Sequence, residues 1–260
     1  MDPRLQIIDR RMAGVRRILA VTGGKGGIGK SSLAATAALW LARRGERVGL
    51  LDLDFCGPST HVILGIRDAR PVEDGGLVPA IAQGLRFMSI VHFIDDRPAP
   101  LRGQEISNAL IELLAITRWG DLDWLVIDMP PGFSDPLLDA ARLLGRAEYL
   151  VVTTPSALTT ETVRKALQLF RELRLPVLGV VENMRRGGEP PLAAQGEPPL
   201  AAQGEAPLAA QLAGFDVPLL GAIPFDEAYE AALGDVERLA HTTFMRAVGR
   251  IVDAITARRD

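Results

Sequence analysis

The stretch that decides the fold is residues 18–33, which read ILAVTGGKGGIGKSSL. An apolar run comes first, a glycine-rich loop follows, and a stretch rich in leucine and alanine continues from it. Between Gly24 and Ser31 the loop fits the pattern G-x-x-x-x-G-K-[ST], in the order strand, loop and helix that gives this pattern its meaning. Glycines let backbone N–H groups wrap phosphates, and the start of a helix adds its dipole. The sequence therefore predicts a phosphate-binding loop.

Two side chains of this loop have chemical roles that the pattern itself predicts. Lys30 should bridge the β- and γ-phosphates of a nucleotide, and the Ser31 hydroxyl should hold Mg²⁺. The chain has only three lysines, of which Lys25 and Lys30 lie here, where a guanidinium could not replace a compact ammonium without changing the geometry. The predicted nucleotide contacts in the loop are Gly24, Lys25, Gly26, Gly27, Ile28, Gly29, Lys30, Ser31 and Ser32.

Outward from the loop, short apolar strands alternate with helical stripes along most of the chain. Parallel strands need such helical crossovers, so we predict an α/β fold with a doubly wound, mostly parallel sheet and one domain over residues 1–260. Ligands of such sheets bind at the carboxyl ends of the strands. The predicted strands are 17–22, 48–54, 85–90, 124–128, 149–153, 176–182 and 218–223, and the predicted helices are 30–44, 106–114, one from Ser134 and Pro136, 160–173 and 236–255.

Acidic residues follow two of these strands. Asp52 and Asp54 close the second strand, where alternation should send their side chains to opposite faces. Asp128 ends the run WLVID in the manner of a Walker B aspartate, which binds Mg²⁺ through water, and residues 130–132 follow it as a predicted switch loop. For Asp52 two interpretations stay open, a helper of Asp54 and a solvated carboxylate at the end of a strand.

The two lysines of KGGxGK[ST] resemble the deviant Walker A, SIMIBI-like P-loop ATPases, the group of MinD, ParA, the nitrogenase iron protein and Mrp/NBP35. Four segments are similar to the Mrp/NBP35 branch, over roughly residues 16–235: DFCGPS at 54–59, DMPPG at 128–132, VVENM at 180–184 and IPFD at 223–226. The resemblance implies a cytoplasmic homodimer that binds and hydrolyses ATP with Mg²⁺, in or near metallocluster assembly or bound to a client protein.

The resemblance also implies roles for particular residues. Lys25 would reach the nucleotide of the partner subunit, and Asp54 would orient the attacking water, so the catalytic set is Lys25, Lys30 and Asp54. The metal set is Ser31, Asp54 and Asp128. Asn183 would read the adenine, whose other side is lined by Pro224, Phe225 and Asp226.

One departure from that branch concerns its cargo. Mrp/NBP35 proteins hold a bridging iron–sulfur cluster through a C-x-x-C motif soon after E-N-M, whereas this chain continues with RRGG at 185–188. Thiolates are the normal ligands of such clusters, and Cys56 is the single cysteine. We expect Cys56 to be a small packed residue. The alternative function is therefore a MinD- or ParA-like positioning or regulatory ATPase without a cluster; a small-molecule ATP-dependent enzyme is a third.

Composition excludes several other classes. With 48% hydrophobic and 23% charged residues and a net charge of −3, the chain is globular and has no basic footprint for nucleic acid. The charged start predicts a cytoplasmic protein, and a membrane role is disfavoured, although a membrane-targeting final helix is an alternative to a packed one.

Residues 185–211 form a predicted inserted loop, in which 188–211 repeat GEPPLAAQ, GEPPLAAQ and GEAPLAAQ. His61, His92 and His241 lack metal spacing and should be structural or solvated.

Overall fold

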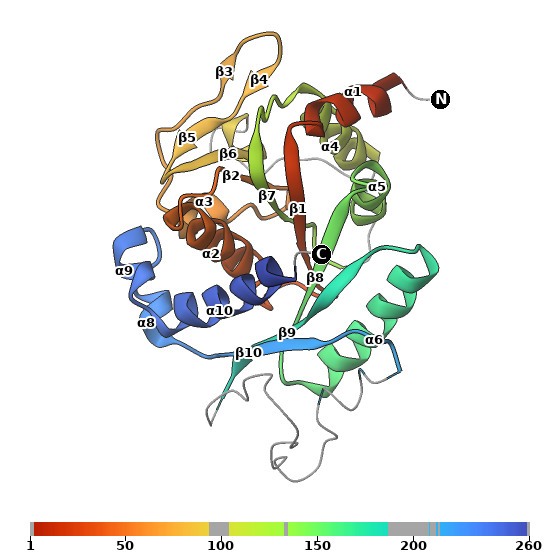
Figure 1. The fold of residues 1–260 in the computed structure, drawn as a ribbon, viewed down its shortest axis with the longest axis vertical. Helices are drawn as coiled ribbons and strands as arrows, with labels where there is room; N and C mark the ends of the chain where they lie inside the picture. The colour runs from red at the N-terminus through yellow and green to blue at the C-terminus, as the bar shows by residue number, and fades with distance from the viewer. Residues whose placement is uncertain are drawn as a thin grey trace.

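A computed structural model describes residues 3–93, 104–132, 135–186 and 214–258, together with Leu208 and Leu212. Within these residues an eight-stranded sheet runs in the order β10-β9-β8-β1-β7-β2-β6-β5 (Figure 1). All its neighbouring pairs are parallel except β5 with β6, which confirms the predicted mostly parallel sheet. The strands are β1 (Val15–Thr22), β2 (Val48–Asp52), β5 (Ala80–Ala82), β6 (Leu85–Ser89), β7 (Leu122–Asp128), β8 (Ala147–Thr153), β9 (Val177–Arg185) and β10 (Leu219–Pro224). A separate ribbon pairs β3 (Val72–Glu73) with β4 (Leu77–Val78).

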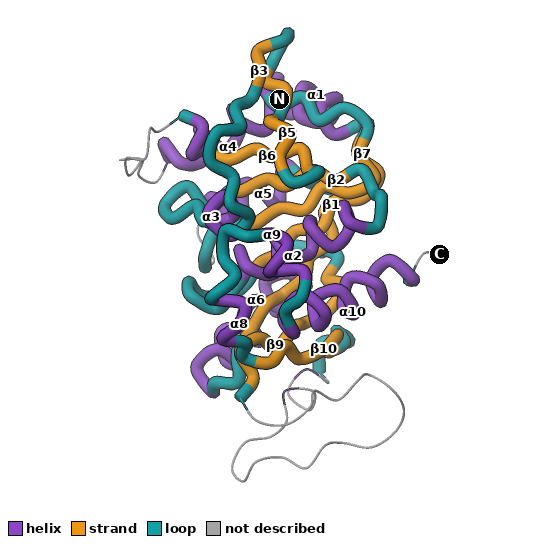
Figure 2. The backbone as a smooth tube through the Cα atoms, turned by 90° about the vertical axis from the view of Figure 1, so that its left-hand side faces the viewer, coloured by secondary structure: helices purple, strands orange, loops and turns teal. Residues whose placement is uncertain are grey.

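Helices cover both faces of the sheet (Figures 1 and 2). Because side chains alternate along β1, Leu19 and Val21 join the core beneath α2 and α10, while Ile18 and Ala20 join the core beneath α1, α4, α5 and α6. Burial on both faces explains why the central strands are continuous apolar runs. The helices are α1 (Pro3–Met12), α2 (Lys30–Arg43), α3 (Thr60–Ile63), α4 (Gln104–Ile116), α5 (Asp135–Leu143), α6 (Ala157–Glu172), α8 (Glu227–Glu230), α9 (Val236–Ala240) and α10 (Thr243–Ala257), with a 3₁₀ turn at Ile90–His92.

Two strands end more than one residue from the predicted position, and both ends lie at the carboxyl edge of the sheet. β2 stops at Asp52, so Asp54 lies in the following turn and the argument from strand alternation does not apply to it. β9 continues to Arg185, so Asn183 lies within a strand rather than after one. Each shift changes how the side chain is held at this edge.

The predicted final helix over 236–255 is two helices. The hydroxyl of Thr242 accepts a hydrogen bond from the backbone N–H of Met245, which caps α10, and the Asp235 carboxylate caps α9 in the same way. A capping side chain needs an extended backbone, which interrupts the helix at Thr242. The apolar side of α10 packs into the core, as Phe244, Val248 and Ile251 show, so the packed interpretation is confirmed. Among the described residues no helix combines the length and apolar character needed to cross a bilayer.

Several elements were not predicted: α1, α3, the β3–β4 ribbon, β5, α8 and the 3₁₀ turn. They are short or lie at the rim of the fold, except for α1, where Ile8 and Met12 are buried. Ser134 lies outside the described residues. So does the octapeptide segment, apart from Leu208.

Candidate functional site

The glycine-rich loop joins β1 to α2 at the carboxyl edge of the sheet. Gly29 has φ 85°, a left-handed conformation that glycine adopts without strain, and its carbonyl accepts the first hydrogen bond of α2 from Leu33. The side chain of Lys30 is nearly buried, with 5% of its surface exposed, and its Nζ lies 3.3 Å from the carbonyl oxygen of Lys25. Lys25 itself is exposed. The loop thus holds one ammonium inside and presents the other to solvent.

The sheet places two aspartates beside this loop. β1 lies between β8 and β7, and β7 lies between β1 and β2. In register, Asp128 of β7 pairs with Val21 of β1 on one side and with Asp52 of β2 on the other. Asp128 and the loop therefore meet at one edge, as expected from the carboxyl ends of parallel strands, and Asp52 lies beside Asp128.

Asp128 has an unusual environment. Both of its carboxylate oxygens are buried, and neither has a hydrogen-bond partner within the described part of the chain. Burial and the nearby Asp52 raise the pKa of Asp128 well above its ordinary value, while the Ser31 hydroxyl and the Lys30 ammonium oppose that rise. A buried carboxylate without partners is costly unless a ligand satisfies it. Oxygen ligands of this kind fit Mg²⁺, which takes one or two protein oxygens and keeps several waters.

Asp52 differs from Asp128 because its carboxylate is saturated with donors. It is fully buried, and it accepts hydrogen bonds from the hydroxyl of Thr60 at 2.7 Å and from the backbone N–H groups of Asp54, Ser59 and Thr60. Burial raises the pKa of Asp52 above its ordinary value, and the hydrogen bonds oppose the shift. The interpretation of Asp52 as a solvated carboxylate is therefore wrong.

The turn after β2 carries Asp54 and the single cysteine. The Oδ1 of Asp54 accepts a hydrogen bond from the backbone N–H of Gly57 at 3.1 Å, and the side chain is partly exposed. Phe55 takes the buried position of this turn, which leaves Cys56 exposed. The prediction of a packed Cys56 is thus wrong. Among the described residues no group of three or more His, Cys, Asp or Glu could hold a metal ion.

Asn183 lies against the phosphate-binding loop from the other side. Its Nδ2 donates a hydrogen bond to the carbonyl oxygen of Ile28 at 2.9 Å, and the residue is buried, with 2% of its surface exposed. A Cβ added at Gly29 would overlap this same Nδ2, so glycine is required there for space as well as for its backbone angle. The sequence predicted Asn183 near the nucleotide but did not predict this contact with the loop.

The other residues predicted around the adenine lie at the end of β10, where Pro224 is the last residue of the strand and Phe225 and Asp226 follow it. The ring of Phe225 is 45% exposed and lies 5.3 Å from the guanidinium carbon of Arg186. The carboxylate of Asp226 is engaged in structure: Oδ1 caps α8 through Ala228 N–H, and Oδ2 accepts from Phe244 N–H at 2.8 Å. Sequence reasoning missed Arg186, although it directly follows the strand.

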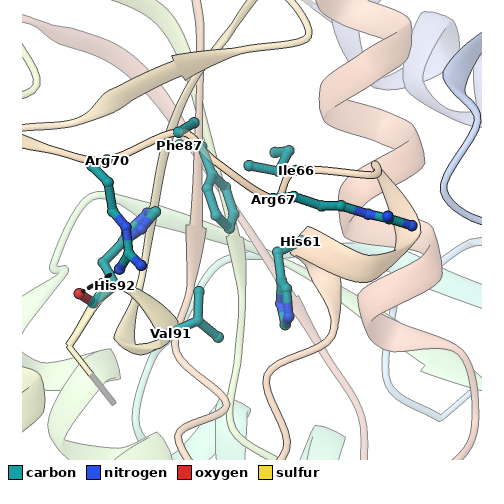
Figure 3. A pocket seen from close by; sticks show the side chains of 8 residues that line it. His61, Ile66, Arg67, Arg70, Phe87, Val91 and His92 are labelled. Atoms are coloured by element: carbon teal, nitrogen blue, oxygen red, sulfur yellow. Dashed lines mark hydrogen bonds between the residues drawn. The ribbon is translucent and has the colours of Figure 1, made fainter. Parts of the chain in front are cut away.

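A cavity of about 130 Å³ lies beyond α3 and is lined by His61, Ile66, Arg67, Ala69, Arg70, Phe87, Val91 and His92 (Figure 3). Burial, Arg70 and His61 lower the pKa of His92 to about 4, so this imidazole is neutral near pH 7. The guanidinium of Arg70 donates to the His92 carbonyl at 3.2 Å. None of the residues lining the cavity belongs to the phosphate-binding loop.

Comparison with known proteins identifies the family of this chain. Residues 14–258 match the model of the ParA family, described as NUBPL iron-transfer P-loop NTPase. An iron-sulfur cluster carrier protein from Pseudomonas fragi is 48% identical over 177 residues, which are 66% of this chain and 62% of that protein. One from Escherichia coli (strain K12) is 43% identical over 174 residues, 66% of this chain and 47% of that protein. The chain thus spans about half to two thirds of the length of these curated relatives.

Solved structures agree. A nucleotide-binding protein from Archaeoglobus fulgidus in complex with ADP is 30% identical, with a TM-score of 0.72 over 91% of this chain and 93% of the other. The septum site-determining protein MinD from Pyrococcus horikoshii, solved with Mg-ADP, is 19% identical with a TM-score of 0.64 over 92% and 95%, and supports the fold. With its whole sheet inside the matched range, the chain belongs to the ParA family of NUBPL-type iron-transfer P-loop NTPases.

Proposed function

We propose that this chain binds and hydrolyses ATP with Mg²⁺ and acts as a dimeric switch of the iron–sulfur cluster carrier kind. The observation that carries the proposal is that a buried ammonium and a buried carboxylate without hydrogen-bond partners lie at the same edge of the sheet. Lys30 is 5% exposed with a backbone carbonyl as its partner, and both oxygens of Asp128 lack one. A magnesium nucleotide supplies what each group lacks, phosphate oxygens for one and a hydrated cation for the other.

The roles of the surrounding residues follow from their positions. Backbone N–H groups of residues 24–32 bind the phosphates at the start of α2. Ser31 and Asp128 would hold Mg²⁺, and Asp54 would contact the ion through water and orient the attacking water. Bound Mg²⁺ neutralises charge on the phosphates during transfer. The half-exposed ring of Phe225 offers a face for the adenine, beside Asn183, Pro224 and Asp226.

The proposed dimer rests on Lys25. Its side chain is exposed at the rim of the loop, while Lys30 occupies the interior. An ammonium in that position is suited to reach a nucleotide held by a second copy, where it would offset charge on the transferring phosphoryl group. ATP would close this dimer and hydrolysis would reopen it.

The cargo is proposed from the relatives, which are iron–sulfur cluster carrier proteins by name. Cys56 is exposed and offers one thiolate, so two copies would offer two, half of the usual four-thiolate set. This shortage favours a second candidate, a positioning or regulatory ATPase that grips a client protein without a cluster.

Two loop variants test the ATPase and the dimer. We expect Lys30→Ala to abolish binding of ATP, measured by calorimetry, because it removes the interior ammonium. Lys25→Ala should keep ATP binding but lose most of the turnover. Normal hydrolysis by Lys25→Ala would contradict the dimer, and a wild-type chain that neither binds nor hydrolyses ATP would contradict the proposal as a whole.

Anaerobic reconstitution with iron and sulfide separates the two candidates. The carrier proposal expects visible absorbance from thiolate-bound iron that disappears in Cys56→Ser. Absence of such absorbance in the wild-type chain, with ATP hydrolysis intact, favours the regulatory ATPase.

A further inference from the structure

The carboxylate of Asp52 organises the turn that carries Asp54. Its Oδ2 accepts hydrogen bonds from the hydroxyl of Thr60 at 2.7 Å and from the N–H groups of Ser59 and Thr60, both at 3.2 Å. Its Oδ1 accepts from the N–H of Asp54 at 3.0 Å. One side chain at the end of β2 thus ties the beginning of the turn to its end, eight residues along the chain.

Further contacts complete the turn. The N–H of Leu53 donates to the carbonyl of Asp128 at 2.9 Å, which holds the start of the turn to β7. Phe55 is buried, with 3% exposure. Asp54 lies between these two anchors, so its backbone direction is set by Leu53, Phe55 and the bond from its own N–H to Asp52.

Asp52 and Asp128 stand side by side in register but differ in chemistry. Asp128 has two buried oxygens with no hydrogen-bond partner among the described residues, so their lone pairs are available to a cation. Asp52 has four donors on its two oxygens, three of them on Oδ2. Charge-assisted hydrogen bonds of this kind are about twice as strong as neutral ones, so they hold the turn rather than leave lone pairs for a ligand.

We propose that Asp52 and Thr60 form a latch that positions Asp54, and that Asp52 is a positioning residue and not a metal ligand. The proposal rests on the proposed function in one respect, the role of Asp54 toward the attacking water. Thr60 is fully buried on the side of Asp52, and the next residue, His61, lines the cavity beyond α3 (Figure 3). The short helix α3 therefore holds Thr60 in the interior of the protein, next to Asp52.

Thr60→Val and Thr60→Ser are a matched pair for the test. Valine keeps the shape of threonine and removes the hydroxyl, whereas serine keeps the hydroxyl. For Thr60→Val we expect kcat for ATP to fall by roughly tenfold to a hundredfold, because a displacement of about 1 Å at a reacting group has an effect of this size. The KM for ATP and the Mg²⁺ concentration that gives half-maximal rate should stay within about twofold of wild type, since the phosphate loop and the two groups proposed to hold the metal directly, Ser31 and Asp128, are unchanged. The separate variant Thr60→Ser should keep the wild-type kcat.

Asp52→Asn extends the test to the other partner. The amide keeps the volume but loses the charge and one acceptor, so we expect the same loss of kcat at an unchanged Mg²⁺ requirement. A many-fold increase in that requirement in Asp52→Asn, with Thr60→Val at the wild-type rate, would show that Asp52 binds the metal and would overturn the latch. If Thr60→Val does not fold by circular dichroism, Thr60→Ala provides the same comparison with serine.

Asp54→Asn separates failure of the latch from failure of the proposed function. If wild type hydrolyses ATP while Asp54→Asn is inactive and Thr60→Val is fully active, only the latch proposal is wrong. If Asp54→Asn hydrolyses ATP at the wild-type rate, the proposed role of Asp54 is wrong, and the latch falls with it.

Discussion

The side-chain amide of Asn183, in β9, donates a hydrogen bond to the backbone carbonyl of Ile28 across 155 positions of sequence. The bond joins the phosphate-binding loop to Asn183, the residue that the family resemblance implies to read the adenine. Both partners are buried, so little water competes for them.

Asn183→Ala should weaken the phosphate-binding loop itself. The Ile28 carbonyl would lose its buried donor, an effect of about 1–3 kcal/mol, and the loop would have to be ordered on binding. We expect the affinities for ATP, GTP and inorganic tripolyphosphate, measured by calorimetry, to fall together by about tenfold. A loss confined to ATP would instead mean that Asn183 acts on the adenine alone.

Gly29→Ala should abolish nucleotide binding. The new Cβ would overlap Nδ2 of Asn183, at a backbone φ of 85° that alanine rarely adopts. Gly145→Ala is the matched control, because a Cβ there meets no atom within 4 Å. The expected outcome is wild-type affinity for Gly145→Ala and no measurable heat of ATP binding for Gly29→Ala; binding by both would show that the loop adapts.

Gly249→Ala should destabilise the fold without touching the site. A Cβ on Gly249 would lie 2.5 Å from the indole ring of Trp40, at the contact between α10 and α2. Trp40 cannot easily turn away, since its Nε1 donates to Asp253 at 2.9 Å. We expect the free energy of unfolding, from urea titration, to fall by about 1–3 kcal/mol. Gly214→Ala, which meets no atom within 4 Å, should leave it unchanged.

The ion pair of Arg47 with Asp123 predicts a pH dependence of stability. Hydrogen bonds from Arg47, at 2.9 Å to Oδ1 and 3.1 Å to Oδ2, lower the pKa of Asp123 to about 2, below the roughly 3.9 of an unfolded chain. The unfolded state therefore binds a proton first as pH falls, and the contribution of the pair, complete above about pH 4, disappears toward pH 2.

Urea unfolding of wild type and Asp123→Asn measures this effect by difference. The free energy of unfolding of wild type should exceed that of Asp123→Asn at pH 7, and this difference should be smaller at pH 3. A gap that stays constant or widens at pH 3 would show that the carboxylate contributes nothing through its charge.

The sequence predicted the glycine-rich loop between a strand and a helix, and the positions of the main strands along the chain, because both depend on local patterns. The loop needs a strand, glycines, Lys30 and a helix within one stretch, and the parallel strands are apolar over most of their length. The break at Thr242 was also visible in principle, since threonine and aspartate before an apolar run are capping signals. By contrast, the partners of Asn183 and Asp52 are set by tertiary contacts, which no local pattern specifies. The exposure of Cys56 likewise follows from Phe55 taking the buried place in the turn.

β9 and β10 are parallel neighbours, so the chain between them must return from one end of the sheet to the other. That return contains the three octapeptide units. The entropy of closing such a connection grows only with the logarithm of its length, so adding or deleting one unit of eight residues changes the free energy by roughly 0.2–0.3 kcal/mol. A change in the number of octapeptide units is thus expected to alter the free energy of unfolding only slightly.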